Sequence, residues 1–375
     1  MVGVAEAGLG LAEPGTTPVD LMAAASGDAL ADAGVTLDQV DAVFASTTPL
    51  GMAPLNLVEY LGLQPKYLDG TQIGGSSAVS HINHARIALE AGEIEVALVA
   101  YGSTQRSVGR AKAAPQELDQ YEMLFSPTMP VAAYALAASR HMRVFGTTEE
   151  QLAEVAVATR SWAVHNPRAW SRDPLTVADV LASPPVATPL KVRDCCLTTD
   201  GGGAMVITTA ERARQLRRPP VHVLGIGEAA SHRHITSMPE LTVTAAKQSG
   251  AMAYAMAGLG PEDIDVLGLY DAFTITPILF LEDLGFCAKG EGGAFVEGGR
   301  IAFGGELPVN TNGGGLSYNH PGMYGLLLMV ETVRQLRGEC GPRQVSDANV
   351  ALAHANGGVL SSQATVIFGT PETLA

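Results

Sequence analysis

Short apolar stretches alternate along the chain with longer Ala-rich stretches of helical character. The apolar stretches are rich in Val, Ile and Leu and do not alternate with polar residues, which is typical of strands buried on both faces. We expect strands at 40–46, 96–101, 205–208, 221–226, 266–269, 350–353 and 365–368. We expect helices at 21–33, 77–91, 243–257 and 325–336. This alternation predicts an α/β fold with covered sheets.

One pattern occurs twice in the sequence. A predicted helix ends at Gly34, and a short acidic turn and a strand follow; the same succession begins at Gly258, 224 residues later, with identical internal spacing. Glycine at such a position is typical of a left-handed helix cap. The repeat predicts two similar halves, 1–215 and 216–375. The stretch 103–190 departs from the alternation of strands and helices and contains several Pro and Trp residues. We expect it to be an insertion of loops and helices that covers a site.

Composition and charge narrow the class of protein. The chain has 375 residues, of which 47% are apolar and 16% charged, which excludes a disordered chain, a coiled coil and a disulfide scaffold. Its formal net charge of −15 disfavours partners such as nucleic acids and anionic membranes. No apolar run of transmembrane length and no signal peptide is evident, so we expect a cytoplasmic protein.

The four cysteines do not form a recognisable motif. They stand at positions 195, 196, 287 and 340, with neither CxxC spacing nor the pattern of a disulfide framework. We expect reduced thiols, and we assign no metal ligands.

Four polar or Gly-rich segments are candidates for chemistry. Gly74-Gly75-Ser76 opens a predicted helix and offers free N–H groups to an oxyanion, although tight packing of a helix on a strand explains it equally well. The loop 310–322 contains His320 directly before a proline, which stiffens the loop and aims the imidazole. Two further segments follow predicted strands, at 270–273 (Tyr-Asp-Ala-Phe) and 354–358, where α/β proteins place site residues.

In this order, the four segments resemble the thiolase-like superfamily, in its branch of sterol carrier and lipid-transfer proteins. Residues 270–273 match the Asn-Glu-Ala-Phe or His-Asp-Cys-Phe motif, 313–321 the Gly-His-Pro motif and 355–357 the Cys-x-Gly motif. Residues 194–204 resemble the strand and turn that precede the second half of these proteins. The resemblance spans the whole chain and implies a five-layer fold of two similar βαβαβαββ halves, usually dimeric.

The departures from the family pattern bear on function. A thiolase uses one cysteine as acyl nucleophile and a second as acid and base. Here the nucleophile position falls on Gly75 or Ser76, the second cysteine on Ala355, and the Asn or His of the third motif on Tyr270. We expect the four existing cysteines to be structural. What remains of the family's machinery is His320 and the glycine turn that begins at Gly357.

The resemblance implies that His320 and Tyr270 form an oxyanion hole for the enolate of a CoA thioester. Aldol or retro-aldol chemistry on a β-hydroxyacyl-CoA needs such an enolate but no acyl-enzyme. We therefore expect a carbon–carbon lyase that resembles the steroid side-chain aldolases of the lipid-transfer-protein type. The CoA thioester is the substrate, a steroid side-chain thioester being one candidate, and no covalently bound cofactor is expected.

The resemblance also predicts partners. Those aldolases work with a partner protein that carries a zinc-ribbon and an OB-fold domain. The apolar strand 96–101 has no charged residue within it, and we expect it to be an edge that must be covered. In the family, the equivalent strand pairs across a two-fold axis, which predicts a homodimer and, with the partner, a heterotetramer.

The site prediction joins the motifs. Tyr270 and His320 should converge on one pocket with the turns Gly75-Ser76 and Gly357-Gly358, and Tyr318 and Tyr324 should lie nearby. Packing on the following helix explains the last two tyrosines equally well. A tyrosine suits a proton relay only if a cationic or donor neighbour lowers its pKa from about 10.

Three alternatives stay open. An acyltransferase would use Ser76 as nucleophile and His320 as base, since Ser–His pairs perform acyl transfer. A non-catalytic subunit would scaffold an active partner. A module that binds a lipid or small molecule would need no chemistry. A covalent adduct formed with labelled acetyl-CoA would support the first of these.

Overall fold

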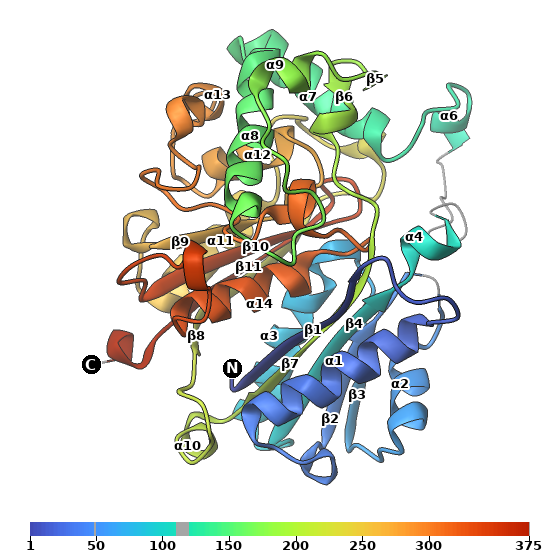
Figure 1. Ribbon diagram of the computed structural model, residues 1–375, viewed down its shortest axis with the longest axis vertical. Coiled ribbons are helices and arrows are strands. Elements are labelled where there is room, and N and C mark those ends of the chain that lie inside the picture. The colour runs from blue at the N-terminus through green and yellow to red at the C-terminus, as the bar shows by residue number, and fades with distance from the viewer. Residues whose placement is uncertain (49, 110–119, 375) are drawn as a thin grey trace.

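The computed structural model describes residues 1–48, 50–109 and 120–374, and in it two mixed sheets dominate (Figure 1). The first has the strand order β1-β7-β4-β2-β3 and the second β8-β11-β10-β9. The strands of the first sheet are β1 (Gly3–Gly10), β7 (Asp200–Thr208), β4 (Val96–Ser103), β2 (Ala42–Ser46) and β3 (Tyr67–Asp69). Those of the second are β8 (His222–Ala230), β11 (Ser362–Gly369), β10 (Val350–Gly357) and β9 (Val266–Leu269).

Helices separate and cover the two sheets. The helices α3 (Ser77–Glu90) and α14 (Gly325–Leu336) contact each other and lie between the sheets (Figure 1). The outer face of the first sheet is covered by α1 (Pro18–Ala33) and α2 (Ala53–Leu61), and that of the second by α11 (Ala246–Ala257). Strands β2, β4, β9 and β10 are buried along their whole length, and in β10 this includes the polar residues His354 and Asn356. The result is five layers, α/β/α/β/α.

The two sheets repeat each other in detail. Within each, β2 or β9 runs parallel to its neighbour, β4 or β10, so the two strands of the repeat hold equivalent positions. A Cβ on Gly3 would lie 2.0 Å from the carbonyl oxygen of Ala29, and one on Gly225 would lie 2.1 Å from that of Ala253. In both halves, glycine therefore lets the outer helix approach the outermost strand. These facts support the proposal of two similar halves, and the boundary near 215, after α10 (Ala210–Ala213), stays a prediction.

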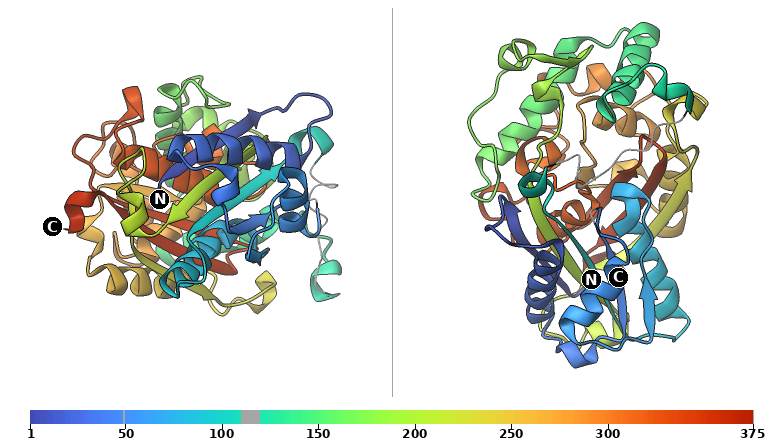
Figure 2. Two further views of the ribbon diagram at one scale, coloured as in Figure 1. Left: turned by 90° about the horizontal axis from the view of Figure 1, so that it is seen from below. Right: turned by 90° about the vertical axis from the view of Figure 1, so that its right-hand side faces the viewer.

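The predicted insertion, 103–190, is mostly helical where it is described, and its residues 110–119 lie outside the described part of the chain. It contains α4 (Gln105–Val108), α6 (Gln120–Met123), α7 (Val131–Phe145), α8 (Glu149–Val164), α9 (Val177–Leu181) and the strand β5 (Pro185–Ala187), which pairs with β6 (Leu190–Lys191). Helices α7, α8 and α9 gather at one end of the molecule, with α12 (Ile275–Asp283) and α13 (Gly292–Phe295) (Figures 1 and 2). No helix among the described residues is both long and apolar enough to cross a membrane.

The expectation that 96–101 forms an edge strand is wrong. Strand β4 pairs with β2 on one side and with β7 on the other, so it lies inside the first sheet. Its sequence carries no charge because both of its faces are buried. The edges of the sheet are β1 and β3, and on β3 the residues Tyr67 and Leu68 are 37% and 40% exposed. The homodimer itself stays a prediction, and β3 replaces β4 as the strand that a second copy would cover.

Candidate active site

A cavity of about 550 Å³ lies where strand ends and loops of both halves meet the insertion. Of the residues predicted for the site, Tyr270, His320, Gly75 and Gly358 all line it. Tyr134 of α7, Cys196 and Asn356 also line it, and none of these three was predicted as a site residue. The structure thus brings the core of the predicted set together and adds further polar side chains to it, these three among them.

Tyr270 and His320 touch through their polar atoms. Tyr270 directly follows β9, and its Oη lies 3.1 Å from the Nε2 of His320. The backbone N–H of Tyr324 donates to the same Oη at 3.1 Å. The two rings are nearly perpendicular, with an angle of 89° between their planes. Both contacts fix the position of the phenol oxygen at the cavity wall.

Burial determines the charge state of this phenol. It raises the pKa of Tyr270 well above its ordinary value, and the N–H of Tyr324 opposes that effect only in part. A proton relay through Tyr270 required a lowered pKa, and the structure gives the opposite direction. At neutral pH the hydroxyl therefore keeps its proton, which suits it to donate a hydrogen bond to a developing oxyanion rather than to act as a base.

Asp271, the second residue of the Tyr-Asp-Ala-Phe motif, holds the loop that carries His320. Its carboxylate accepts hydrogen bonds from the backbone N–H groups of Gly315, at 2.6 Å, and Leu316, at 3.2 Å. Both belong to the helical turn Gly314–Tyr318. Burial raises the pKa of Asp271 to about 7, and the two N–H donors lower it. Asp271 therefore positions the imidazole through the loop and does not itself line the cavity.

Gly75 makes room for the ring of Tyr270. A Cβ on residue 75 would lie 2.2 Å from the Cε2 of Tyr270 and 2.5 Å from the carbonyl oxygen of Asn356. A side chain at this helix start would therefore collide with the phenol. Gly74 adopts a positive φ of 82°, and a Cβ there would lie 2.6 Å from the backbone nitrogen of Gly358. The two predicted glycine turns pack directly against each other.

Ser76 and Gly357 lie behind these turns and do not line the cavity. The hydroxyl of Ser76 is buried and lies 3.3 Å from the carbonyl oxygen of Ile73 and 3.0 Å from the Oγ of Ser362. A Cβ on Gly357 would lie 1.8 Å from the same carbonyl oxygen. The Ser76–His320 pair required by the acyltransferase alternative is not formed in this arrangement.

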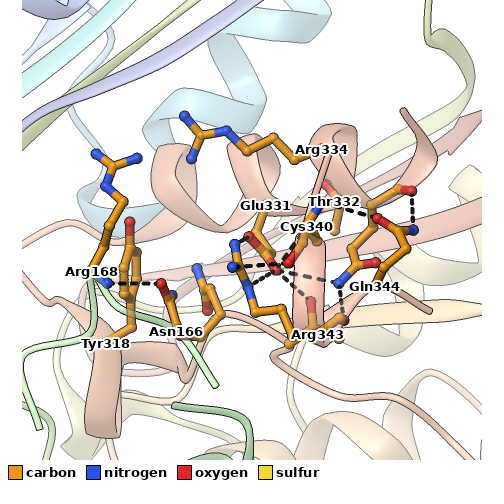
Figure 3. A network of polar contacts seen from close by, with 12 residues as sticks. Asn166, Arg168, Tyr318, Glu331, Thr332, Arg334, Cys340, Arg343 and Gln344 are labelled. Atoms are coloured by element: carbon orange, nitrogen blue, oxygen red, sulfur yellow. Dashed lines mark hydrogen bonds and ion pairs between the residues drawn. The ribbon is translucent and has the colours of Figure 1, made fainter. Parts of the chain in front are cut away.

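The structure does not bring the hydroxyls of Tyr318 and Tyr324 to the cavity. That of Tyr318 donates to Glu6 at 2.8 Å, in a buried cluster where Arg168 and Arg334 neutralise the carboxylate; Figure 3 shows Tyr318 beside Arg168. That of Tyr324 donates to the Oδ1 of Asn312 at 2.8 Å. Tyr324 contributes its backbone N–H to the site, and Tyr318 serves packing and a hydrogen bond to Glu6 elsewhere.

A chain of buried hydrogen bonds leads to Tyr134, whose hydroxyl donates to the carbonyl oxygen of Gly358 at 3.3 Å. The side-chain N–H of Asn356 donates to the Tyr134 hydroxyl at 2.8 Å, and that of Gln363 donates to the Oδ1 of Asn356 at 2.9 Å. Since the Gln363 nitrogen is used in this way, its oxygen accepts from the Nε2 of His354, at 2.9 Å. The Nδ1 of His354 then accepts from the hydroxyl of Thr365, at 2.8 Å. Every donor in the chain points toward the cavity.

Sequence reasoning missed Tyr134 because no motif surrounds it. It is a lone tyrosine in an Ala-rich helix of the insertion, more than a hundred residues from Asn356, its partner. The one usable indication was the expectation that the insertion covers a site.

Three of the cysteines lie outside the cavity and one lines it. Burial raises the pKa of Cys287 to about 12 and that of Cys340 well above its ordinary value, so both are thiols rather than nucleophilic thiolates at neutral pH. The backbone of Cys195 forms an isolated antiparallel β-bridge with that of Phe273. Cys196, expected to be structural, lies at the cavity wall with Tyr270 and His320.

Comparisons with known proteins agree with this geometry. A family model described as thiolase C-terminal domain-like matches residues 227–370. The chain is 34% identical to an acetyl-CoA acetyltransferase of Methanothermobacter thermautotrophicus, over 93% of this chain and 94% of that protein. It is 33% identical to a steroid side-chain-cleaving aldolase of Thermomonospora curvata, over 95% of each.

Among solved structures, the Ltp2-ChsH2(DUF35) aldolase superposes with a TM-score of 0.89 and 30% identity, over 100% of this chain and 98% of that one. The resemblance and the thiolase-like α/β fold expected from the sequence are thereby confirmed. The chain belongs to the thiolase superfamily, in the branch that contains the steroid side-chain-cleaving aldolases.

Proposed function

We propose that this protein is an aldolase that cleaves the Cα–Cβ bond of a β-hydroxyacyl-CoA. The observation that carries the proposal is the replacement of a nucleophile by a donor: the Tyr270 ring fills the space beside Gly75, and His320 and the Tyr324 N–H fix its hydroxyl. The aldolase relatives, which match over nearly the whole chain, support it and point to a steroid side-chain thioester as substrate.

The residues fit the chemistry of a retro-aldol cleavage. A base removes the proton of the β-hydroxyl group, the β-carbon becomes a carbonyl, and the electron pair of the Cα–Cβ bond passes to the thioester as an enolate. The enolate then takes up a proton at Cα. The neutral Tyr270 phenol, whose hydroxyl donates to the carbonyl oxygen of Gly322 at 3.4 Å, would turn that proton to the enolate oxygen while its Oη accepts from the Tyr324 N–H. Loss of one such donor typically costs about 3–4 kcal/mol of transition-state stabilisation.

The decisive assay uses a CoA thioester with a β-hydroxyl group and a steroid ring at the β-carbon. Incubation without free CoA should release the steroid ketone and a shorter acyl-CoA, detected by mass spectrometry. In D₂O the released acyl-CoA should carry one deuterium at Cα, because the enolate is protonated by solvent-exchangeable hydrogen. No cleavage of this thioester, together with CoA-dependent cleavage of the corresponding β-ketoacyl-CoA into two thioesters, would contradict the proposal.

The acetyltransferase relative favours acyl transfer as a second candidate. In that case, labelled acetyl-CoA would leave a covalent adduct on the protein, which peptide mapping would place on Ser76 or Cys196. A protein that forms no adduct and cleaves no thioester would instead be a scaffold or a binding module.

The proposal extends to partners. The structural neighbour is a complex, Ltp2-ChsH2(DUF35), and this supports a second protein for this chain, which the family resemblance describes as a zinc-ribbon and OB-fold protein. We propose a homodimer through β3 that binds two partner molecules. Native mass spectrometry should show a dimer that Leu68→Lys on the edge strand dissociates, and the more exposed Leu55→Lys on α2 is the control. A monomer at micromolar concentration would contradict the dimer.

A further inference from the structure

A second cavity, of about 480 Å³, lies between α8, α9 and the segment that leads to Cys196. Helices α8 and α9 contact each other (Figure 1), and residues of both line this cavity. The side chains of Arg160, Ser171, Asp179 and Arg193 line it, as does Leu197, which also lines the catalytic cavity. The two cavities therefore lie on opposite sides of one wall.

Arg160 is a buried cation that the protein satisfies only in part. The residue is 6% exposed; its Nε donates to the Oγ of Ser317 and its Nη1 to the carbonyl oxygen of Asp173, both at 2.8 Å. A guanidinium has five N–H donors. Within the described part of the chain, Nη2 has no hydrogen-bond partner and no carboxylate lies within ion-pair distance of Arg160. Nη2 is not among the buried polar atoms that lack a partner, so it is open to solvent, and its donors are available to an anion that enters the cavity.

The charges around the cavity favour an anion as well. Arg193, an exposed residue, faces the same space, and burial followed by the positive charge of Arg193 lowers the pKa of Arg160. The single carboxylate in the lining, that of Asp179, accepts hydrogen bonds from the backbone N–H of Thr176, at 2.9 Å, and from its hydroxyl, at 2.6 Å, as part of the cap of α9. Asp173 raises the pKa of Arg160 from a distance without pairing with it.

We propose that this second cavity binds an oxyanion, a carboxylate or phosphate group, between Arg160 and Arg193. A guanidinium matches two oxygens of such a group with parallel N–H bonds, and the free end of Arg160 faces the cavity for this purpose. The hydroxyl of Ser171 lies in the same lining as a neutral donor. The site does not depend on the aldolase proposal, because none of these side chains lines the catalytic cavity.

An occupant of this second cavity would be linked to the catalytic cavity through a chain of contacts that begins at Arg160. Arg160 donates to Ser317, which belongs to the turn Gly314–Tyr318 that Asp271 clamps just before His320. An anion on Arg160 would neutralise the charge that this turn contacts. The ligand class is therefore a small anionic metabolite or the anionic end of a larger molecule that reaches this face.

Isothermal titration of the purified full-length protein, in chloride buffer, with inorganic phosphate and separately with succinate tests the proposal. We expect saturable one-site binding of at least one anion, and the stronger of the two distinguishes phosphate from carboxylate. Arg193→Gln should weaken binding about fivefold and Arg160→Gln about tenfold or more, because the buried donor is the better desolvated of the two. Arg143→Gln, which removes the same charge from an exposed position on α7, should leave binding unchanged.

Two outcomes would overturn the site. One is the absence of saturable binding of either anion to the folded wild-type protein. The other is equal binding by wild type and Arg193→Gln, a variant at an exposed position that keeps every contact of Arg160. If Arg160→Gln fails to fold, as circular dichroism would show, the comparison of Arg193→Gln with Arg143→Gln decides.

Discussion

The ring of Tyr270 lies where any side chain on residue 75 would have to lie, since a Cβ there would come within 2.2 Å of its Cε2. A nucleophilic side chain on residue 75 and the phenol in its present position therefore exclude each other. Residue 75 is one of the two positions on which the family's cysteine falls, the other being Ser76. We propose that this steric exclusion is why the site presents a hydroxyl donor in place of a nucleophile at residue 75.

Gly75→Ala should lower the rate of thioester cleavage nearly as much as removal of the Tyr270 hydroxyl, because the methyl group must displace the ring. The same overpacking should reduce the free energy of unfolding by about 1–3 kcal/mol. Steady-state kinetics and denaturant unfolding measure the two effects. Gly27→Ala, at a position of α1 where a Cβ meets no atom within 4 Å, is the control. Unchanged kinetics in Gly75→Ala would show that the ring position is unimportant.

Tyr270→Phe should reduce kcat about 10²–10³-fold and leave KM for the thioester nearly unchanged, because it removes a donor used in the transition state and keeps the ring. Tyr254→Phe, which removes a remote hydroxyl bonded to the carbonyl oxygen of Leu284, should have normal kinetics. Full activity of Tyr270→Phe would argue against an oxyanion role for this phenol.

Single Cys→Ala substitutions at 195, 196, 287 and 340 should leave thioester cleavage intact. Cys196→Ala is the informative variant, because Cys196 alone of the four lines the catalytic cavity. The other three serve as matched controls, and circular dichroism verifies that each variant folds. Loss of catalysis in folded Cys196→Ala, together with loss of an acetyl adduct, would instead indicate covalent catalysis by Cys196.

Gln363→Leu should destabilise the fold by about 2–6 kcal/mol. It leaves the Nε2–H of His354 and the Oδ1 of Asn356 buried without partners, and each such group costs about 1–3 kcal/mol. Gln248→Leu, at an exposed position of α11, should change the free energy of unfolding little. Equal stability of both variants in urea titrations would mean that the chain of hydrogen bonds leading to Tyr134 adds nothing to the free energy of unfolding.

His354 should make the fold sensitive to acid. Burial lowers its pKa from 6.5 to about 3, so the unfolded chain binds a proton that the folded protein refuses, and the unfolding free energy falls as pH drops from 6.5. Burial raises the pKa of Asp271 from 3.8 to about 7, so over this pH range Asp271 increases the unfolding free energy as pH drops, opposite to His354. The difference in unfolding free energy between wild type and His354→Gln should therefore shrink as pH drops, by up to about 1.4 kcal/mol per pH unit. A difference that does not vary between pH 6.5 and 4 would contradict the assignment.

The sequence alone identified the strands β2, β4 and β7 to β11 and the helices α1, α3, α11 and α14, and it indicated that two units repeat, but it missed elements such as β1 and α2. Burial on both faces requires an uninterrupted apolar run, and a left-handed cap requires glycine, so Gly34 and Gly258 carry that information locally. The motifs also predicted that Tyr270 and His320 lie together. The same local information could not distinguish a central strand from an apolar edge, and β4 was misplaced for that reason.

Only the tertiary structure decided what each polar group does. The pKa of Tyr270 depends on how completely other segments exclude water from it, and the role of Tyr318 depends on a contact with Glu6, 312 residues away. Tyr134 and Arg160 gain their significance from partners in distant segments, Asn356 and Ser317. Desolvation and hydrogen bonding act between groups that folding brings together, so they leave no pattern among neighbours in the sequence.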